Sequence, residues 1–347
     1  MKMNFRWYGK EDKISLEQIR QIPGVTGIVS AIYDVPVGEI WPLERIINLK
    51  KEIEEHNLSL NVIESVPVPE DIKMGLDTRD KYIENYRETL KNIAKAGIEV
   101  VVYNFMPVFD WTRSQLDYEL EDGSKALIYK EEDVQKMDPL KGDMQLPGWD
   151  TSYEQDELNS LMKQYQQISK NDLWNNLEYF LKQIIPVAEK NDIKMAIHPD
   201  DPPWSIFGLP RIITDKESLE KCINLVDSPS NGLALCSGSL GVKSDNNIPQ
   251  LVRYFGQKGK IHFGHVRNIK NTGEFSFQEA AHKSDAGSLD IFEIMKAYYD
   301  IGFEGPIRPD HGRMIWGEEG KPGYGLYDRA LGATYLNGIW ETLVRVD

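Results

Sequence analysis

Cysteine is scarce in this chain, because Cys222 and Cys236 are the two cysteines among 347 residues. A disulfide framework needs several pairs, so none is expected and both thiols should be free. Excess positive charge is also lacking, since 40 Lys and Arg residues stand against 55 Asp and Glu residues, a net charge of −15. A nucleic-acid partner needs clustered positive charge and is therefore not expected. A small molecule is the expected partner.

Long apolar runs are missing as well, beginning with the amino-terminal segment. Residues 1–13 carry charged side chains throughout and contain no apolar core, whereas a signal peptide or a membrane anchor needs one. We therefore expect no membrane association and a cytoplasmic protein. Low-complexity blocks are absent too, and 41% of the residues are hydrophobic, which is enough to fill a sizeable core.

What the chain does have is an alternation of short apolar runs and amphipathic segments. The runs lack strict polar alternation, which indicates parallel strands buried on both faces. The clearest helix is predicted at 80–96, where apolar residues recur at helical spacing before Gly97. Further helices are predicted at 42–56, 173–191, 289–301 and 327–343. The predicted strands are Met3–Trp7, Val25–Ser30, Leu60–Glu64, Glu99–Asn104, Lys194–His198, Leu233–Cys236, Ile261–Val266 and Pro306–Asp310.

This order predicts an α/β fold, a (β/α)8 TIM barrel, because about eight strands separated by helices are what that barrel requires. A barrel with insertions fills 347 residues, so one catalytic domain over residues 1–347 is expected. Residues 106–172 break the alternation after the fourth strand with several prolines and glycines, then a polar helical segment from 153 to 169. A connection this long is usually functional, which favours a rim or lid region over a decorative insertion.

Four residues able to bind a metal ion stand at the ends of four predicted strands: His198, Cys236, His265 and Asp310. Strand ends on one rim of a barrel converge, so these side chains are expected to meet around one ion. Singly, each has an ordinary interpretation as a hydrogen-bonded, packed or salt-bridged residue. Four at successive strand ends indicate a metalloenzyme. His262 lies on the same predicted strand as His265, but at a position whose side chain points to the opposite face. His262 is therefore expected to point away from the ion and to pack.

The ligand types leave the ion open. Thiolate and imidazole favour zinc, iron or cobalt, whereas carboxylate is compatible with manganese or magnesium. Asp310 belongs to the segment Arg308–Arg313, the densest group of chemically capable residues in the chain. Pro309 favours an extended backbone, and Gly312 permits a turn in which Asp310 and His311 reach one cavity.

Other polar or aromatic residues close predicted strands or follow them shortly. Each alone is compatible with a helix cap or a surface position, but together they predict the wall of a pocket for a small polar substrate. These rim residues are Arg6, Tyr8, Ser65, Asn104, Trp111 and Arg113.

Several segments together carry a family resemblance that spans almost the whole chain. The most specific is Asn-Phe-Met-Pro-Val-Phe-Asp-Trp-Thr-Arg at 104–113. The others are Phe5–Gly9, Glu64–Val68, Glu70–Lys73, His198–Pro203, Phe207–Arg211, Cys236–Gly241, His262–Arg267, Arg308–Arg313 and Pro322–Gly325. With these segments the chain closely resembles the mannonate dehydratase family, which are xylose-isomerase-like TIM barrel lyases. The insertion resembles the variable region of that family.

The resemblance implies a carbon–oxygen lyase that dehydrates D-mannonate to 2-keto-3-deoxy-D-gluconate in hexuronate breakdown. The matching positions make His198, Cys236, His265 and Asp310 the metal ligands. The ion that the resemblance implies is Mn²⁺, with Fe²⁺ or Co²⁺ as alternatives.

Dehydration of a sugar acid needs a base for the C2 proton and an acid for the leaving C3 hydroxyl. His311 and Tyr324 are the two candidates, and the sequence leaves open which does which; Tyr324 is equally compatible with an aromatic residue that packs in a turn. Arg308 and Arg313 join Arg6 and Arg113 as candidates to hold the carboxylate and hydroxyls.

Two rival functions fit the same residues. A metal-dependent sugar isomerase on this barrel would use similar ligands, usually with more carboxylates and no cysteine. A non-catalytic sugar-acid-binding protein would need no acid–base pair beside the ion. Apolar faces of the barrel also allow a homodimer, which one sequence does not locate.

Overall fold

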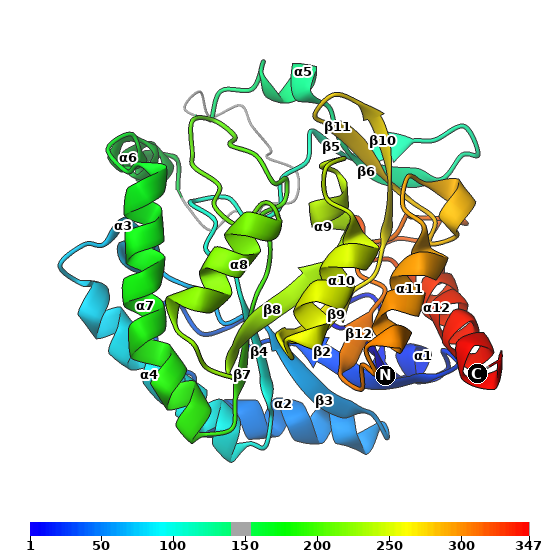
Figure 1. Ribbon diagram of the computed structural model, residues 1–347, viewed down its shortest axis with the longest axis horizontal. Helices are drawn as coiled ribbons and strands as arrows, with labels where there is room; N and C mark the ends of the chain where they lie inside the picture. The colour runs from blue at the N-terminus through cyan, green and yellow to red at the C-terminus, as the bar shows by residue number, and fades with distance from the viewer. Residues whose placement is uncertain (140–153, 347) are drawn as a thin grey trace.

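The computed structural model describes residues 1–139 and 154–346 and shows a closed barrel of eight parallel strands (Figure 1). The strands pair in the order β1-β12-β9-β8-β7-β4-β3-β2, which confirms the predicted barrel. They are β1 Lys2–Arg6, β2 Val25–Ser30, β3 Ser59–Glu64, β4 Val100–Tyr103, β7 Lys194–Ile197, β8 Asn231–Cys236, β9 Ile261–His265 and β12 Pro306–Arg308. All eight were predicted, and their bounds differ from the predicted ones by at most two residues.

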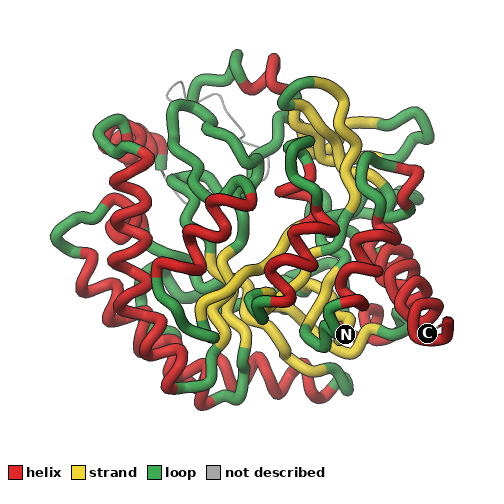
Figure 2. Tube along the Cα trace, in the orientation of Figure 1, coloured by secondary structure: helices red, strands yellow, loops and turns green. Residues whose placement is uncertain are grey.

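Helices surround the strands (Figure 2). They are α1 Leu16–Arg20, α2 Leu43–Glu55, α3 Glu70–Met74, α4 Arg79–Lys95, α5 Glu131–Val134, α6 Gln155–Tyr165, α7 Lys170–Lys190, α8 Lys216–Leu225, α9 Ser237–Gly241, α10 Ile248–Gln257, α11 Ile291–Asp300 and α12 Tyr327–Val346, with the short 3₁₀ helix η1 Ser284–Ala286. In α4 the apolar face buries Ile83, Tyr86, Leu90 and Ile93, so the helical spacing in the sequence matches the face that packs on the barrel. Among the described residues, no helix is both long enough and apolar enough to cross a membrane.

The inside of the barrel is filled by small and branched side chains. They form one cluster of Val29, Val62, Val100, Val102, Ala196, Ala234 and Phe263. Phe263 and His265 lie on the same side of β9, with their ring centroids 4.6 Å apart. The barrel is therefore a packed core, and its polar residues start where the strands end.

A second sheet, which we call the cap, covers part of the carboxyl end of the barrel. Its four antiparallel strands lie in the order β10-β11-β6-β5, seen at the upper right in Figure 1. Their bounds are β5 Gln115–Glu119, β6 Lys125–Tyr129, β10 Asn268–Gly273 and β11 Ser276–Ala280. The strands of the insertion after β4 thus pair with strands of a second long connection, which follows β9.

The structure adds a second connection to the cap that the sequence did not indicate. The sequence indicated one inserted region, but half of the cap comes from the connection after β9, and Tyr129 pairs with Phe277 across the two. The polar helix predicted from 153 to 169 is α6 Gln155–Tyr165. Residues 140–153 of the insertion, including the start of that predicted helix, lie outside the described residues.

Candidate metal centre and active site

The four candidate ligands come from one side of the barrel. His198 directly follows β7, and Cys236 is the last residue of β8. His265 is the last residue of β9, and Asp310 lies two residues beyond β12. Because β7, β8, β9 and β12 are consecutive neighbours in the barrel, their carboxyl ends bring the four side chains to one rim.

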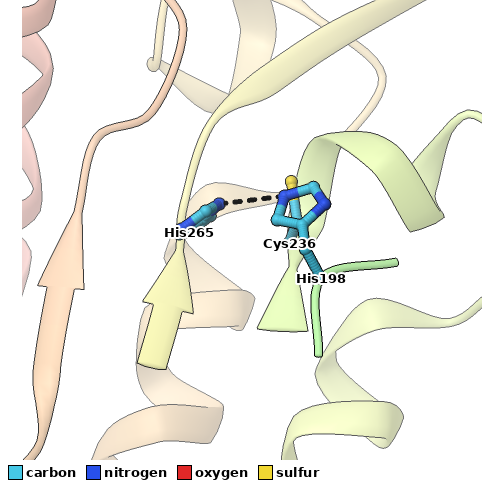
Figure 3. Close-up of side chains that lie close together, drawn as sticks. All are labelled: His198, Cys236 and His265. Atoms are coloured by element: carbon cyan, nitrogen blue, oxygen red, sulfur yellow. Dashed lines mark hydrogen bonds between the residues drawn. The ribbon is translucent and has the colours of Figure 1, made fainter. Parts of the chain in front are cut away.

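The donor atoms of His198, Cys236 and His265 all lie within 4.8 Å of one another (Figure 3). His198 Nε2 and His265 Nδ1 face each other at 3.2 Å. Asp310 Oδ2 is 3.5 Å from Cys236 Sγ and 3.9 Å from His265 Nδ1. Two imidazole nitrogens and a sulfur therefore converge, and a carboxylate oxygen lies beside two of them. This donor set fits a divalent metal ion.

Hydrogen bonds on the far side of each imidazole fix which nitrogen faces the other donor atoms. His198 Nδ1 donates to the Pro199 carbonyl oxygen at 2.7 Å, which leaves the lone pair on Nε2. His265 Nε2 accepts from Arg308 Nε at 3.1 Å and lies 3.2 Å from Glu64 Oε1, so Nε2 is engaged on the far side of the ring and Nδ1 is the nitrogen that faces the other donor atoms. Burial raises the pKa of Glu64, but Arg308 and His265 outweigh it and hold the pKa well below its usual range. Glu64 is therefore an ionised acceptor.

The backbone at Asp310 differs from the sequence prediction. Gly312 was expected to supply the turn, but the residue in the left-handed region is Asp310 itself, at φ 56°. Aspartate tolerates this conformation better than most residues. Gly312 is constrained by packing instead, because a Cβ there would lie 3.1 Å from Arg329 Cγ and 3.3 Å from Asp328 Oδ2.

Eight buried charged side chains surround the donor atoms and pair with one another. They are Arg6, Arg113, Arg267, Arg308, Glu64, Asp201, Glu279 and Asp310, which we call the ion-pair network. Its four positive and four negative charges cancel. A divalent ion with the Cys236 thiolate would add one net positive charge, and buried charge needs a partner. The network therefore suits an anionic ligand beside the ion.

A cavity of about 300 Å³ opens above this network. Six of the eight predicted substrate-binding residues line it: Arg6, Tyr8, Ser65, Asn104, Trp111 and Arg308. His198, Asp310, His311 and Tyr324 share the same wall. Cys236 and His265 are fully buried beneath it. The structure thus brings metal-ligand, substrate-binding and acid–base candidates to one place.

Two of the predicted arginines lie elsewhere. Arg113 is fully buried in the ion-pair network, where its guanidinium contacts Asp201 at 2.8 and 3.0 Å and Glu279 at 2.9 Å. Arg313 pairs with Asp328 at 3.0 Å and Asp122 at 2.9 Å, outside the cavity wall. Unlike Arg6 and Arg308, neither residue lines the cavity.

His311 and Tyr324 contact each other at the edge of the cavity. His311 Nε2 is 2.8 Å from the Tyr324 hydroxyl, and the His311 ring packs against Trp111 with centroids 5.0 Å apart. Burial raises the pKa of Tyr324 to about 12. Burial also lowers the pKa of His311 from its usual value. Burial therefore favours the neutral form of both groups. A neutral phenol can donate a proton and a neutral imidazole can accept one.

Some residues at the site were not among the candidates from the sequence. Lys73 lines the cavity, and its Nζ donates to Glu70 Oε1 at 2.6 Å and to the Met106 carbonyl oxygen at 2.8 Å. Asp201 follows His198 closely in the chain, so its place at the same strand end was a usable signal. Glu279 lies in β11, where no strand was predicted, and the sequence carried no signal for it.

The whole chain matches known proteins of one kind. A family model described as D-mannonate dehydratase (UxuA) matches residues 1–347. Mannonate dehydratase 2 of Halalkalibacterium halodurans is 62% identical over 343 residues, which cover 99% of each chain. The mannonate dehydratase of Thermotoga petrophila is 58% identical over 353 residues, which cover 99% of this chain and 98% of the relative.

Solved structures agree with these matches. The structure of mannonate dehydratase from Streptococcus suis serotype 2 has a TM-score of 0.93 at 51% identity, and the match covers 100% of this chain and 95% of that one. D-psicose 3-epimerase from Clostridium cellulolyticum H10 has a TM-score of 0.58 at 13% identity over 99% of each chain, a likeness of fold alone. With a family model over every residue and relatives of this identity, the chain belongs to the D-mannonate dehydratase family of hydro-lyases.

Proposed function

We propose that the chain dehydrates D-mannonate to 2-keto-3-deoxy-D-gluconate with a divalent metal ion held by His198, Cys236, His265 and Asp310. The observation that carries the proposal is the convergence of the His198, Cys236 and His265 donor atoms. Asp310 lies beside Cys236, and the His311–Tyr324 pair lines the adjoining cavity. The ion that we propose is Mn²⁺, with Fe²⁺ and Co²⁺ as the alternatives that the mixed donor set also suits. When bound, the ion supplies Lewis acidity that stabilises negative charge on substrate oxygens.

The residues of the chain supply binding and proton transfer. Arg6 and Arg308 line the cavity, and so do the polar residues Ser65 and Asn104, which suit hydroxyls. The carboxylate of D-mannonate would neutralise the charge that the ion and the thiolate leave on the ion-pair network. Binding of the carboxylate at this end would leave C2 and C3 within the cavity that His311 and Tyr324 line.

Two proton steps then convert the substrate. A base removes the C2 proton, the C3–O bond breaks, and an acid protonates the departing hydroxyl, which leaves as water. The remaining enol becomes the 2-keto product when C3 takes up a proton and the hydroxyl on C2 releases one. We assign the base and acid roles to His311 and Tyr324 as a pair, because their reacting atoms are 2.8 Å apart and both side chains line the cavity.

Three expectations from the sequence extend this proposal. The reaction belongs to hexuronate catabolism in the cytoplasm, because D-mannonate is a sugar acid of that breakdown. The chain works as one catalytic domain over residues 1–347, in which residues 106–172 form the rim region beside the cavity. Two copies associate as a homodimer.

The proposal is tested with protein stripped by a chelator and supplied with D-mannonate. Mn²⁺, Mg²⁺, Co²⁺ and Zn²⁺ are added separately, and formation of 2-keto-3-deoxy-D-gluconate is followed. We expect no turnover without an ion and the highest turnover with Mn²⁺. D-gluconate, which differs from D-mannonate at C2, is the matched substrate control and should react more slowly.

A second set of substrates separates the rival functions. Aldoses are offered to the same metal-loaded protein, and ketose formation would identify an isomerase. Binding of D-mannonate by calorimetry without product, with any ion, would identify a sugar-acid-binding protein. Either result would overturn the proposed dehydration.

A further inference from the structure

Glu279 is a fully buried carboxylate that the cap places beside the active site. Its strand β11 pairs with β10 on one side, where Glu279 lies opposite Ile269, and with β6 on the other. Phe277, on the same face of β11, stacks on Tyr129 of β6 with centroids 5.6 Å apart. Strands from the connection after β4 and from the connection after β9 therefore fix where this carboxylate lies.

One oxygen of Glu279 receives three donors. Oε1 lies 2.9 Å from Arg113 Nη2 and 3.3 Å from His311 Nδ1, and it also accepts from Arg267 Nη1. Burial alone would raise the pKa of Glu279, but Arg267 and its other partners lower it to about 2. An ionised carboxylate is an acceptor only, so His311 must carry its proton on Nδ1.

The other nitrogen of the ring is then available for chemistry. With Nδ1–H donated to Glu279, His311 Nε2 keeps its lone pair, and this atom is the one that faces the Tyr324 hydroxyl at 2.8 Å. The Asp310 carboxylate is 3.9 Å from Nε2, beyond hydrogen-bond distance. A carboxylate on the far nitrogen of an imidazole is an established way to hold its tautomer and orientation.

We propose that Glu279 is a positioning residue, which holds the His311 ring and its tautomer so that Nε2 points to Tyr324 and the cavity. The inference rests on the proposed dehydration, in which His311 moves a proton. It also gives the cap a function, because a strand of the cap delivers the carboxylate. The competing role for Glu279 is that of a counter-ion for Arg113 and Arg267, without effect on the His311 ring.

Two variants of equal charge separate these roles. Glu279→Gln keeps an oxygen acceptor for His311 Nδ1, whereas Glu279→Leu has a similar volume and no acceptor. Any cost of the lost negative charge is common to both. If Glu279 positions His311, kcat on D-mannonate should be about 10- to 100-fold lower in Glu279→Leu than in Glu279→Gln, with KM much less changed. Equal kcat values would overturn the proposal.

A nuclear magnetic resonance readout is independent of turnover. The chain has six histidines, so ¹⁵N-histidine labelling gives few imidazole signals, and His311→Gln identifies the one from His311. The metal-free full chain and Glu279→Gln should show a His311 Nδ1–H proton shifted downfield, and Glu279→Leu should lose it. A signal unchanged in Glu279→Leu would refute the positioning role even if D-mannonate proved not to be the substrate.

A second variant background, Arg113→Gln, controls for a failure of the Glu279 variants to fold. Arg113→Gln removes one guanidinium from the same network, so pairing it with either Glu279 variant restores the balance of charge. If the single variants do not fold, the two double variants are compared by the same kinetic and resonance measurements. The positioning role again requires the glutamine variant to exceed the leucine variant, and equality overturns it.

Discussion

Replacing His311 with alanine is expected to lower kcat on D-mannonate by about 10²- to 10⁴-fold, the usual contribution of a positioned acid or base. The ring lines the cavity with Nε2 2.8 Å from the Tyr324 hydroxyl, so alanine removes one of the two groups assigned to the proton steps. Because Arg6 and Arg308 remain in the wall, the loss should fall on kcat more than on KM. Steady-state kinetics of the Mn²⁺-loaded variant measure both constants.

Metal content separates this effect from loss of the ion. His311 is not one of the four proposed ligands, so elemental analysis should find as much Mn²⁺ in the variant as in the unchanged chain. His56→Ala is the matched control, because His56 pairs with Glu17 at 2.9 Å outside the cavity wall; its kcat should stay within about twofold. Near-normal kcat in His311→Ala would remove His311 from the mechanism.

Replacing Arg267 with leucine is expected to lower the free energy of unfolding by about 3–5 kcal/mol, the usual effect of removing one partner from a buried ion pair. Arg267 is fully buried and contacts three carboxylates. Asp201 lies at 2.7 Å and Asp310 at 2.8 Å, and Glu279 is the third. Leucine leaves all three carboxylates without this guanidinium. Urea denaturation of the metal-free chain, followed by circular dichroism, measures the difference.

Arg253→Leu is the control for this prediction. Arg253 lies on α10 and pairs with Asp300 at 2.8 Å, with a third of its side chain exposed. An exposed pair contributes about 0–1 kcal/mol, so this variant should unfold at nearly the urea concentration of the unchanged chain. Equal stability of the Arg253 and Arg267 variants would show that the ion-pair network is not held together by Arg267.

The barrel was predictable from the sequence because its strands are short, and most of their residues are apolar and buried. In β4 all four residues are buried, so the run Val-Val-Val-Tyr carries a clear signal. The cap strand β5 gave no such signal, because its residues alternate between exposed and half-buried and are mostly polar. Its place is set by β6, and that of β6 by β11, a pairing between distant parts of the chain. Local sequence patterns do not encode a pairing of that kind.

The residues of the candidate site also fall into those that the sequence could predict and those that it could not. Residues at the ends of barrel strands, such as His198 and Asp310, could be grouped from the sequence because the barrel fixes where strand ends meet. Arg113 was expected in the pocket wall, and nothing in its segment shows that Asp201 and Glu279 hold it. Glu279 was missed because an acidic residue next to glutamine suggests an exposed position. Its burial depends on Arg113 and Arg267, which reach it from other elements.

The cap also matters while the chain is being made. The β5–β6 hairpin leaves the ribosome with one edge of β6 unpaired, because Phe277, the partner of Tyr129, follows 148 residues later. At a synthesis rate of about 5–20 residues per second, this edge waits roughly 7–30 seconds for β11. Ile128 and Tyr129, the residues of β6 that pair with β11, are buried in the finished protein, and an unpaired apolar edge is a template for aggregation. Solubility of the nascent chain is thus tied to a strand made late in translation.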